Sequence, residues 1–309
     1  MAVIFMAATA FAQGSVKVTA KFSKGDYVIY ETQSDIIQQT VAGNDTTHFV
    51  GEVKYEVTDA RKDGYTLTVN TLKWDSTDPI KNNLMKKITT MQQQMQVGLP
   101  MVLTTDQDGK IIHLNNFEEI RQKIDLYVDE MVNTIFEGMD ERSMQMLSRD
   151  GIQKAIMGEL TEDKILETLS NNTGNHLSLY GKTITTGTTM DEKMGNFGLK
   201  TTYVVSDSKN KDTYSLKSSS VINMNKDDIK ALLIQQLEQM MPEQADAVKE
   251  NIDMVLESGM VKIEGDRQST FEFFKNGWMK SGDVVFNINS MGNVSKTTSK
   301  WRIKESHIK

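Results

Sequence analysis

Cysteine is absent from this chain of 309 residues. Its absence excludes disulfide bridges, thiolate zinc sites and cysteine nucleophiles, and it leaves the redox compartment open. Basic charge is also scarce, since the formal net charge is -7 and the isoelectric point is near 5.3. Nucleic-acid binding needs a basic face that neutralises phosphates, so we expect no nucleic-acid partner. An anionic membrane surface is disfavoured for the same reason.

Catalytic and metal-binding motifs are missing as well. The four histidines, His48, His113, His176 and His307, are scattered without metal-ligand spacing. The stretch from Asp106 to Lys110 resembles the start of a calcium loop but lacks the distal glutamate, so a hairpin turn is the better interpretation. Neither a nucleophile elbow nor a phosphate-binding glycine loop occurs. We therefore expect no enzyme, no cofactor and no metal, with an undetected hydrolase as a minor alternative.

Long apolar runs are missing beyond the first residues, so no transmembrane span is expected. Val3 to Ala8 form a short apolar run, and Ala10-Phe11-Ala12 before Gln13 has the pattern that a signal peptidase cuts. Residues 1–12 are thus predicted to be the remnant of a signal peptide. It lacks a basic n-region, so the true start could lie upstream of Met1, and a buried N-terminal strand is the alternative. The predicted location is periplasmic, cell-surface or secreted.

Alternation of apolar and polar residues dominates the rest of the chain. It predicts half-buried antiparallel strands that turn at Lys24-Gly25-Asp26 and Lys62-Asp63-Gly64. The predicted strands are Val16–Ala20, Tyr27–Thr32, Phe49–Thr58, Tyr65–Trp74, Met101–Thr105, Lys110–Leu114, Met260–Glu264, Thr270–Phe274, Asp283–Asn289 and Ser295–Lys304.

Helical spacing of apolar residues appears between these strands. Helices are predicted from Asp78-Pro79 to Gly98, and after Asn116, which forms a capping box with Glu119. Shorter helices follow as far as Ser170. A further helix has Asn225 as its N-cap, and Pro242 begins another.

Two hairpins repeat one pattern. Lys54 to Leu67 aligns with Thr202 to Leu216, with a tyrosine, valine, aspartate, tyrosine and leucine in common. Each hairpin is followed by a predicted helix. A duplication explains this order, with residues 13–173 and 174–309 as two similar halves, although any two hairpins could share so short a pattern. The predicted fold class is α+β, with large curved antiparallel sheet and helices packed on one face.

Three segments carry a resemblance to known proteins: Phe22 to Tyr30, Lys182 to Met190, and Phe274 to Ser281. They resemble an uncharacterised family of secreted proteins from Bacteroidota-type bacteria, in which the middle segment usually ends in Gly-Asp-x-Trp. Thr188 and Met190 stand in place of that acid and that tryptophan. The predicted sheet is more distantly similar to the half-barrels of LolA- and LppX-type envelope lipid carriers, which is an analogy of fold.

Methionine is abundant, with 20 residues, many of them on predicted helix faces. A flexible, polarizable methionine lining adapts to ligands of varied shape, although methionine also fills irregular gaps in a core. The predicted ligand-lining residues are Met85, Met91, Met95, Met131, Met240 and Met241.

The favoured function is therefore an exported envelope protein that binds an apolar small molecule, a lipid or a lipoprotein segment. A structural or protein-interaction module of the envelope, with another envelope protein as partner and no small-molecule ligand, is the alternative. A cavity between sheet and helices would favour the first of these.

Overall fold

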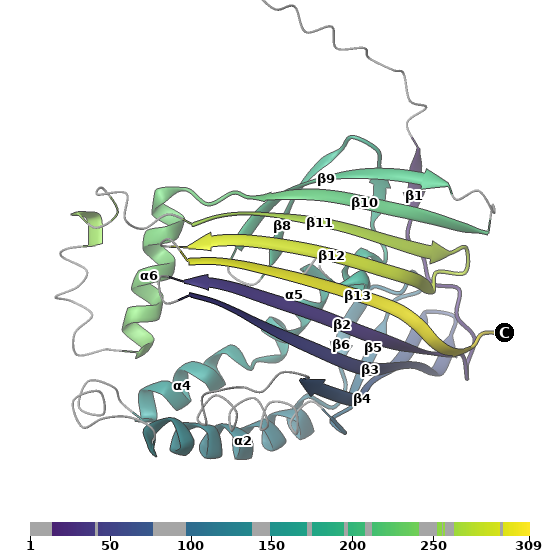
Figure 1. Cartoon of the computed structure of the whole chain (residues 1–309). Coiled ribbons are helices and arrows are strands. Elements are labelled where there is room, and N and C mark those ends of the chain that lie inside the picture. Colours follow the sequence, from purple (N-terminus) through teal and green to yellow (C-terminus); the bar gives the residue numbers. More distant parts are fainter. Residues whose placement is uncertain are drawn as a thin grey trace, which may run out of the picture.

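The computed structural model describes residues 14–40, 43–76, 97–137, 149–171, 175–194, 197–207, 212–240, 252–254, 256, 263–290 and 293–309. Its main feature is an 11-stranded antiparallel sheet with the strand order β6-β5-β4-β3-β2-β13-β12-β11-β10-β9-β8 (Figure 1). Strands β1 (Ser15–Lys17) and β7 (Thr183–Thr185) form a separate two-stranded sheet. The predicted α+β class with a large antiparallel sheet is confirmed.

The first five strands of the large sheet form a meander. They are β2 (Tyr27–Thr40), β3 (Gly43–Arg61), β4 (Gly64–Ser76), β5 (Met101–Thr105) and β6 (Ile111–Leu114). The predicted strands lie inside these, except that Lys110 precedes β6, and β2 and β3 run further than predicted. Polar residues such as Gln33 and Gln39 follow the alternating part of β2, yet β3 and β13 still pair with them. Backbone pairing thus extends the strands beyond their apolar pattern.

The remaining strands belong to the C-terminal part of the chain. They are β8 (Thr189–Met194), β9 (Phe197–Asp207), β10 (Thr213–Ile222), β11 (Ile263–Phe274), β12 (Met279–Ser290) and β13 (Asn293–His307). The described part of the strand predicted at Met260–Glu264 and the strand predicted at Thr270–Phe274 belong to the single strand β11, and residues 260–262 lie outside the described residues. Strand β13 pairs with β2 over almost their whole length, so the two predicted halves share one continuous sheet. The duplication itself is not confirmed and stays a prediction.

The outer face of the sheet is charged and solvated. Lys304 on β13 lies 2.6 Å from Glu52 on β3, across the intervening strand β2, and Arg302 lies 2.7 Å from Asp283 on β12. An antiparallel sheet that packs on one side only shows this division into a polar face and a buried face.

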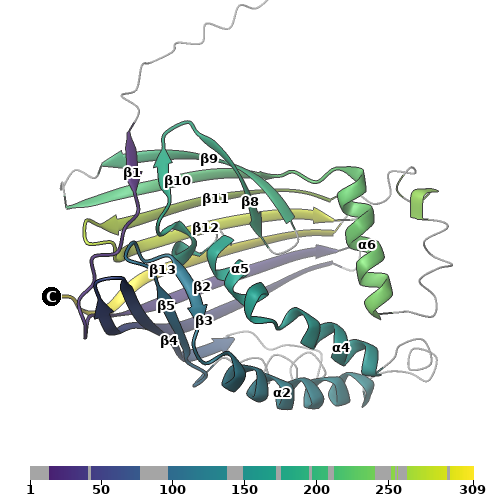
Figure 2. The same ribbon diagram turned by 180° about the vertical axis from the view of Figure 1, so that it is seen from behind.

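Helices lie on the opposite, inner face. In Figure 2, α5 (Glu162–Asn171) is seen in front of the sheet, α4 (Arg149–Glu159) and α2 (Phe117–Glu137) lie below it, and α6 (Lys226–Met240) crosses near one end of the strands. The α2 stripe predicted from spacing is buried at Ile120, Ile124, Val128 and Val132. Within the described residues no helix is long and apolar enough to cross a membrane.

Two predicted helix caps have different outcomes. Asn225 accepts from the Asp228 backbone N–H at 2.9 Å, and the Asp228 carboxylate accepts from the Asn225 N–H at 2.9 Å, which makes a reciprocal cap for α6. Asn116 directly precedes α2, but its side-chain oxygen accepts from the Val102 N–H. Its amide nitrogen donates to the Pro100 carbonyl. The Asn116 side chain is thus hydrogen-bonded to the backbone at the start of β5.

An aromatic core fills one end of the inner face. Phe22 packs on Trp278 with ring centroids 4.3 Å apart, and the Tyr30 hydroxyl donates to the Met279 carbonyl. The 3₁₀ helix η1 (His176–Leu179) brings His176 into this core. Trp278 and Met279 lie just after the turn at Gly277. The φ of Gly277 is +94°, a conformation that glycine adopts without the strain that a side chain would cause. This end of the interior is therefore tightly filled.

Several predictions lie outside the described residues. They are the signal peptide at residues 1–12, most of the helix from Asp78 to Gly98, and the start of the helix at Pro242.

Candidate functional site

The inner face changes character along the strands. Directly paired residues of an antiparallel sheet place their side chains on one face, so the register defines rows that cross the sheet. The row beside the aromatic core, here called the aromatic row, consists of Leu216, Phe271, Gly282, Trp301, Thr32, Gly51 and Trp74. A Cβ at Gly51 would lie 2.8 Å from the Trp74 ring, and one at Gly282 would lie 2.9 Å from the Phe271 ring. Glycine lets these rings lie close against the strands.

The next row is rich in hydroxyl groups. This hydroxyl belt consists of Tyr203, Ser218, Ser269, Val284, Ser299, Ser34, Phe49 and Ser76. The hydroxyls of Ser34 and Ser299 are 2.9 Å apart, and those of Ser218 and Ser269 are 2.6 Å apart. All members except Val284 and Phe49 carry a hydroxyl, so the belt differs from the apolar interior of an ordinary packed sheet.

The third row is mixed and contains a buried arginine. This arginine row consists of Thr201, Ser220, Arg267, Phe286, Thr297, Ile36 and Thr47. Phe286 and Ile36 are half-buried, as are Trp301 and Phe49 in the other two rows. Apolar side chains that remain partly accessible in the middle of an inner face are available to a ligand.

A cluster of charged side chains joins the end of the belt. Glu192 on β8 accepts from the Tyr203 hydroxyl at 2.9 Å and from Lys182 Nζ at 3.1 Å. Arg267 Nη2 lies 3.8 Å from Glu192 Oε2, beyond hydrogen-bond distance, and donates to the Ser220 hydroxyl at 2.8 Å. Ser220 is in turn 2.8 Å from the Thr201 hydroxyl. The cluster ties β8, β9, β10 and β11 together.

Burial governs the protonation of this cluster. It lowers the pKa of Arg267, while the nearby Glu192 carboxylate raises it in part. Burial also raises the pKa of the Tyr203 phenol, and Glu192 raises it further through its charge and the hydrogen bond. Tyr203 is therefore a neutral donor at physiological pH.

Several buried polar atoms on these rows have no hydrogen-bond partner. They are Thr32 Oγ1, Ser76 Oγ, and both Nε and Nη1 of Arg267. Buried polar groups in folded proteins are almost always paired, and an unpaired one costs on the order of 1–3 kcal/mol. These atoms mark places where a water molecule, an ion or a ligand would complete the bonding.

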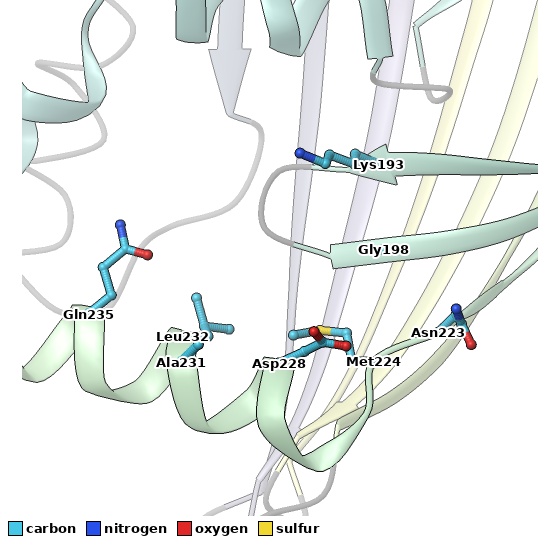
Figure 3. A pocket seen from close by; sticks show the side chains of 8 residues that line it. All are labelled: Lys193, Gly198, Asn223, Met224, Asp228, Ala231, Leu232 and Gln235. Atoms are coloured by element: carbon cyan, nitrogen blue, oxygen red, sulfur yellow. The ribbon is translucent and has the colours of Figure 1, made fainter. Parts of the chain in front are cut away.

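Two hollows flank the hairpin of β8 and β9. One, of about 450 Å³, is lined by Glu192, Asp191, Leu199 and other residues of that hairpin, together with Glu167 of α5 and Asn223 after β10. The other, of about 350 Å³, lies against α6, where Leu232 and Gln235 point toward the side on which Lys193 lies near the end of β8 (Figure 3). The hollows share Lys193, Gly198 and Asn223, and their sizes are typical of small-ligand sites.

The predicted methionine lining is only partly placed. Met131 is half-buried on α2, and Met240 is the last residue of α6. Met85, Met91, Met95 and Met241 lie outside the described residues, so the methionine lining stays a prediction. The Asp106 turn is confirmed as a hairpin turn, because the Asp106 carboxylate accepts from the backbone N–H groups of Asp108 and Lys110. Throughout the described ranges, no group of three or more potential metal ligands occurs.

Sequence reasoning did not identify Arg267 or Glu192 as site residues. Arg267 falls between the strands predicted at Met260–Glu264 and Thr270–Phe274, so its inward direction, which shares the parity of Phe271 and Phe273, follows only from the continuous strand β11. Its proximity to Glu192 was not available from local patterns either, since the two are distant in sequence.

No family model matches the chain, and no curated protein matches it in sequence. Among solved structures it is similar to lipovitellin, from a study of lipid–protein interactions in that protein, with a TM-score of 0.42 and 11% identity over 93% of this chain. The chain spans only 26% of that lipovitellin chain. It is also similar to DynF from the dynemicin biosynthesis pathway of Micromonospora chersina, with a TM-score of 0.21, 6% identity, and 94% of this chain and 84% of that chain covered. Scores this low leave the function to be argued from the site itself.

Proposed function

We propose that this protein binds an amphiphilic, lipid-like molecule on the inner face of its large sheet. The observation that carries the proposal is the hydroxyl belt with its neighbouring rows. Half-buried apolar side chains such as Phe286 and Ile36 lie there beside buried hydroxyls and an arginine that lack partners. A ligand with an apolar chain and a polar group would satisfy both kinds of surface.

The belt disfavours a purely apolar ligand. Covering the half-buried hydroxyls of Ser34 and Ser299 with hydrocarbon would remove them from water without giving new hydrogen bonds, which is unfavourable. A lipid with polar groups, or a polar-headed lipoprotein segment, avoids that cost. We accordingly propose binding in place of catalysis, in an exported protein whose location rests on the Ala10-Phe11-Ala12 pattern.

An interaction module without a small-molecule ligand is the competing function. Such a module would use the outer face of the sheet as its adhesive surface. That face carries ion pairs such as Lys304–Glu52 and Arg302–Asp283. Interaction surfaces are typically poorer in charge at their centre, so this face gives the alternative no specific support.

Tryptophan fluorescence tests the proposal. Trp74 and Trp301 belong to the aromatic row beside the belt, whereas Trp278 is buried in the filled aromatic core. Brominated fatty acids quench a tryptophan only on contact. We expect them to quench a Trp278→Phe variant, which retains the two tryptophans of the aromatic row, and to leave a Trp74→Phe/Trp301→Phe variant unquenched.

A matched pair of variants on β13 locates the site. Ser299 faces the belt and its neighbour Lys300 is exposed on the outer face. Ser299→Leu fills the belt and removes the Ser34 hydrogen bond, so it should weaken binding, whereas Lys300→Leu should not. Equal quenching of the Trp278→Phe variant and the Trp74→Phe/Trp301→Phe variant would contradict the proposed site. Equal binding by Ser299→Leu and Lys300→Leu would contradict it as well.

A further inference from the structure

We propose that the ligand carries a single negative charge and that Arg267 binds its carboxylate or phosphate oxygen. This inference rests on the proposed function and specifies the chemical class of the ligand. It assigns the polar end of the molecule to the β9–β11 end of the arginine row, where Arg267 lies, and its apolar chain to the rest of that row.

The charges of the cluster do not balance. Lys182 and Arg267 are two cations, and Glu192 is the one carboxylate within salt-bridge distance of them among the described residues. Glu192 is engaged by Lys182 and by the Tyr203 hydroxyl at hydrogen-bond distance, and it lies further from Arg267. A buried cation that is neither fully paired nor fully hydrogen-bonded is costly. One added negative charge would neutralise the cluster.

The donors of Arg267 point to the same conclusion. Its side chain is 0% exposed, and of its three nitrogens only Nη2 has a partner, the Ser220 hydroxyl. Nε and Nη1 are N–H donors without an acceptor. Arginine binds carboxylates and phosphates through several N–H groups, and such charge-assisted bonds are about twice as strong as neutral ones. The lowering of the Arg267 pKa by burial agrees with a cation that lacks compensation.

The arginine row offers a path for an apolar chain. Phe286 on β12 is directly opposite Arg267, and Ile36 follows two strands further, both half-buried on the inner face. Four strand spacings separate β11 from β3, which is roughly 19 Å at about 4.8 Å per spacing. A single acyl chain spans about half of the roughly 30 Å hydrocarbon core of a bilayer, so a medium-length chain fits this path.

The hollow beside β8 and β9 lies next to the charged cluster, although Arg267 is not among its lining residues. Glu192 lines that hollow of about 450 Å³, and its carboxylate is 3.8 Å from Arg267 Nη2. Exchange of the loose Arg267–Glu192 contact for a ligand oxygen leaves Glu192 bonded to Lys182 and Tyr203.

Calorimetric titration of the full-length protein with three probes tests the inference. The probes are dodecanoate, dodecanol with the same chain and no charge, and acetate with the same charge and almost no chain. We expect dodecanoate to bind at least about tenfold more tightly than dodecanol, as the gain from charge-assisted hydrogen bonds implies, and acetate to bind weakly. An Arg267→Met variant should lose the preference for the acid, and Arg302→Met on the outer face should keep it.

The outcomes separate the two levels of the proposal. Equal affinity for dodecanoate and dodecanol overturns the anionic head group while amphiphile binding stands. Failure of both long-chain probes overturns the proposed function and this inference together. Acetate that binds as well as dodecanoate identifies a site for a small anion and overturns the amphiphile. Should Arg267→Met not fold, the comparison of the three probes on the unaltered protein still decides.

Discussion

Mild acid is expected to destabilise this protein because of one histidine in the aromatic core. The His176 ring lies among tyrosine rings, with centroids 5.3 Å from Tyr55 and 5.9 Å from Tyr30. Burial there lowers the pKa of His176 from 6.5 to about 3, since the charged form would lose its water. The folded protein thus holds His176 neutral over a range in which the unfolded chain binds a proton.

The sign of the effect follows from proton binding. Between pH 6.5 and about 3 the unfolded state carries one more proton at this position than the folded state, so stability falls as the pH falls. Above pH 6.5 neither state is protonated and the contribution is constant. Each pH unit within the range removes about 1.4 kcal/mol, and the full range amounts to on the order of 5 kcal/mol. That is comparable with the whole stability of many domains.

Urea unfolding followed by circular dichroism, at a series of pH values between about 7 and about 4.5, measures this slope. His176→Phe keeps an aromatic ring in the core and removes the titrating group. We expect its free energy of unfolding to depend less on pH than that of the unaltered protein, by about 1.4 kcal/mol per pH unit.

Leu179→Ala is the matched control for this experiment. Leu179 is buried in the same 3₁₀ helix, so its truncation lowers stability by about 2–5 kcal/mol without removing a titratable group. Its pH slope should equal that of the unaltered protein. The reasoning fails if His176→Phe keeps the full slope, or if Leu179→Ala loses it.

Further predictions concern backbone, cap and surface. Gly277→Ala should cost about 3 kcal/mol or more in urea unfolding, because φ is +94° and the new Cβ would lie 2.3 Å from the Thr19 carbonyl oxygen. Gly187→Ala has a similar φ of +84° and open space, so it should cost only about 1 kcal/mol, and equal losses would contradict the steric argument. Asn225→Ala removes the α6 cap and should lower stability by about 1 kcal/mol, measurable as a lower Tm. Lys304→Met breaks the exposed ion pair with Glu52 and should change stability by less than about 1 kcal/mol, and a larger loss would show that the outer face matters more than an exposed pair allows.

Local patterns determined the position of most strands and helices in this chain. Alternation around Tyr27–Thr32 and Tyr65–Trp74 placed β2 and β4 within the meander, and Asn225 with the acidic residues after it placed the start of α6. These features depend on neighbours within a few residues, so a sequence displays them directly.

Long-range pairing decided what the sequence could not show. The length of β2 depends on its pairing with β3 and β13. The pairing of β2 with β13 also joins the N-terminal and C-terminal strands in one sheet. Asn116 illustrates the limit for caps, since its side chain bonds the start of β5 instead of completing the predicted box.

The candidate site belongs wholly to this second kind of information. The chain by itself determined an α+β protein without cysteine or catalytic motifs, and strands whose inner residues were known by parity. Only the register of several strands brought Arg267 beside Ser220 and near Glu192, and aligned the hydroxyls of Ser34, Ser299 and Ser269 into a belt. Side-chain parity is local, whereas the neighbour across a strand is set by pairing between distant segments, and that pairing made the site.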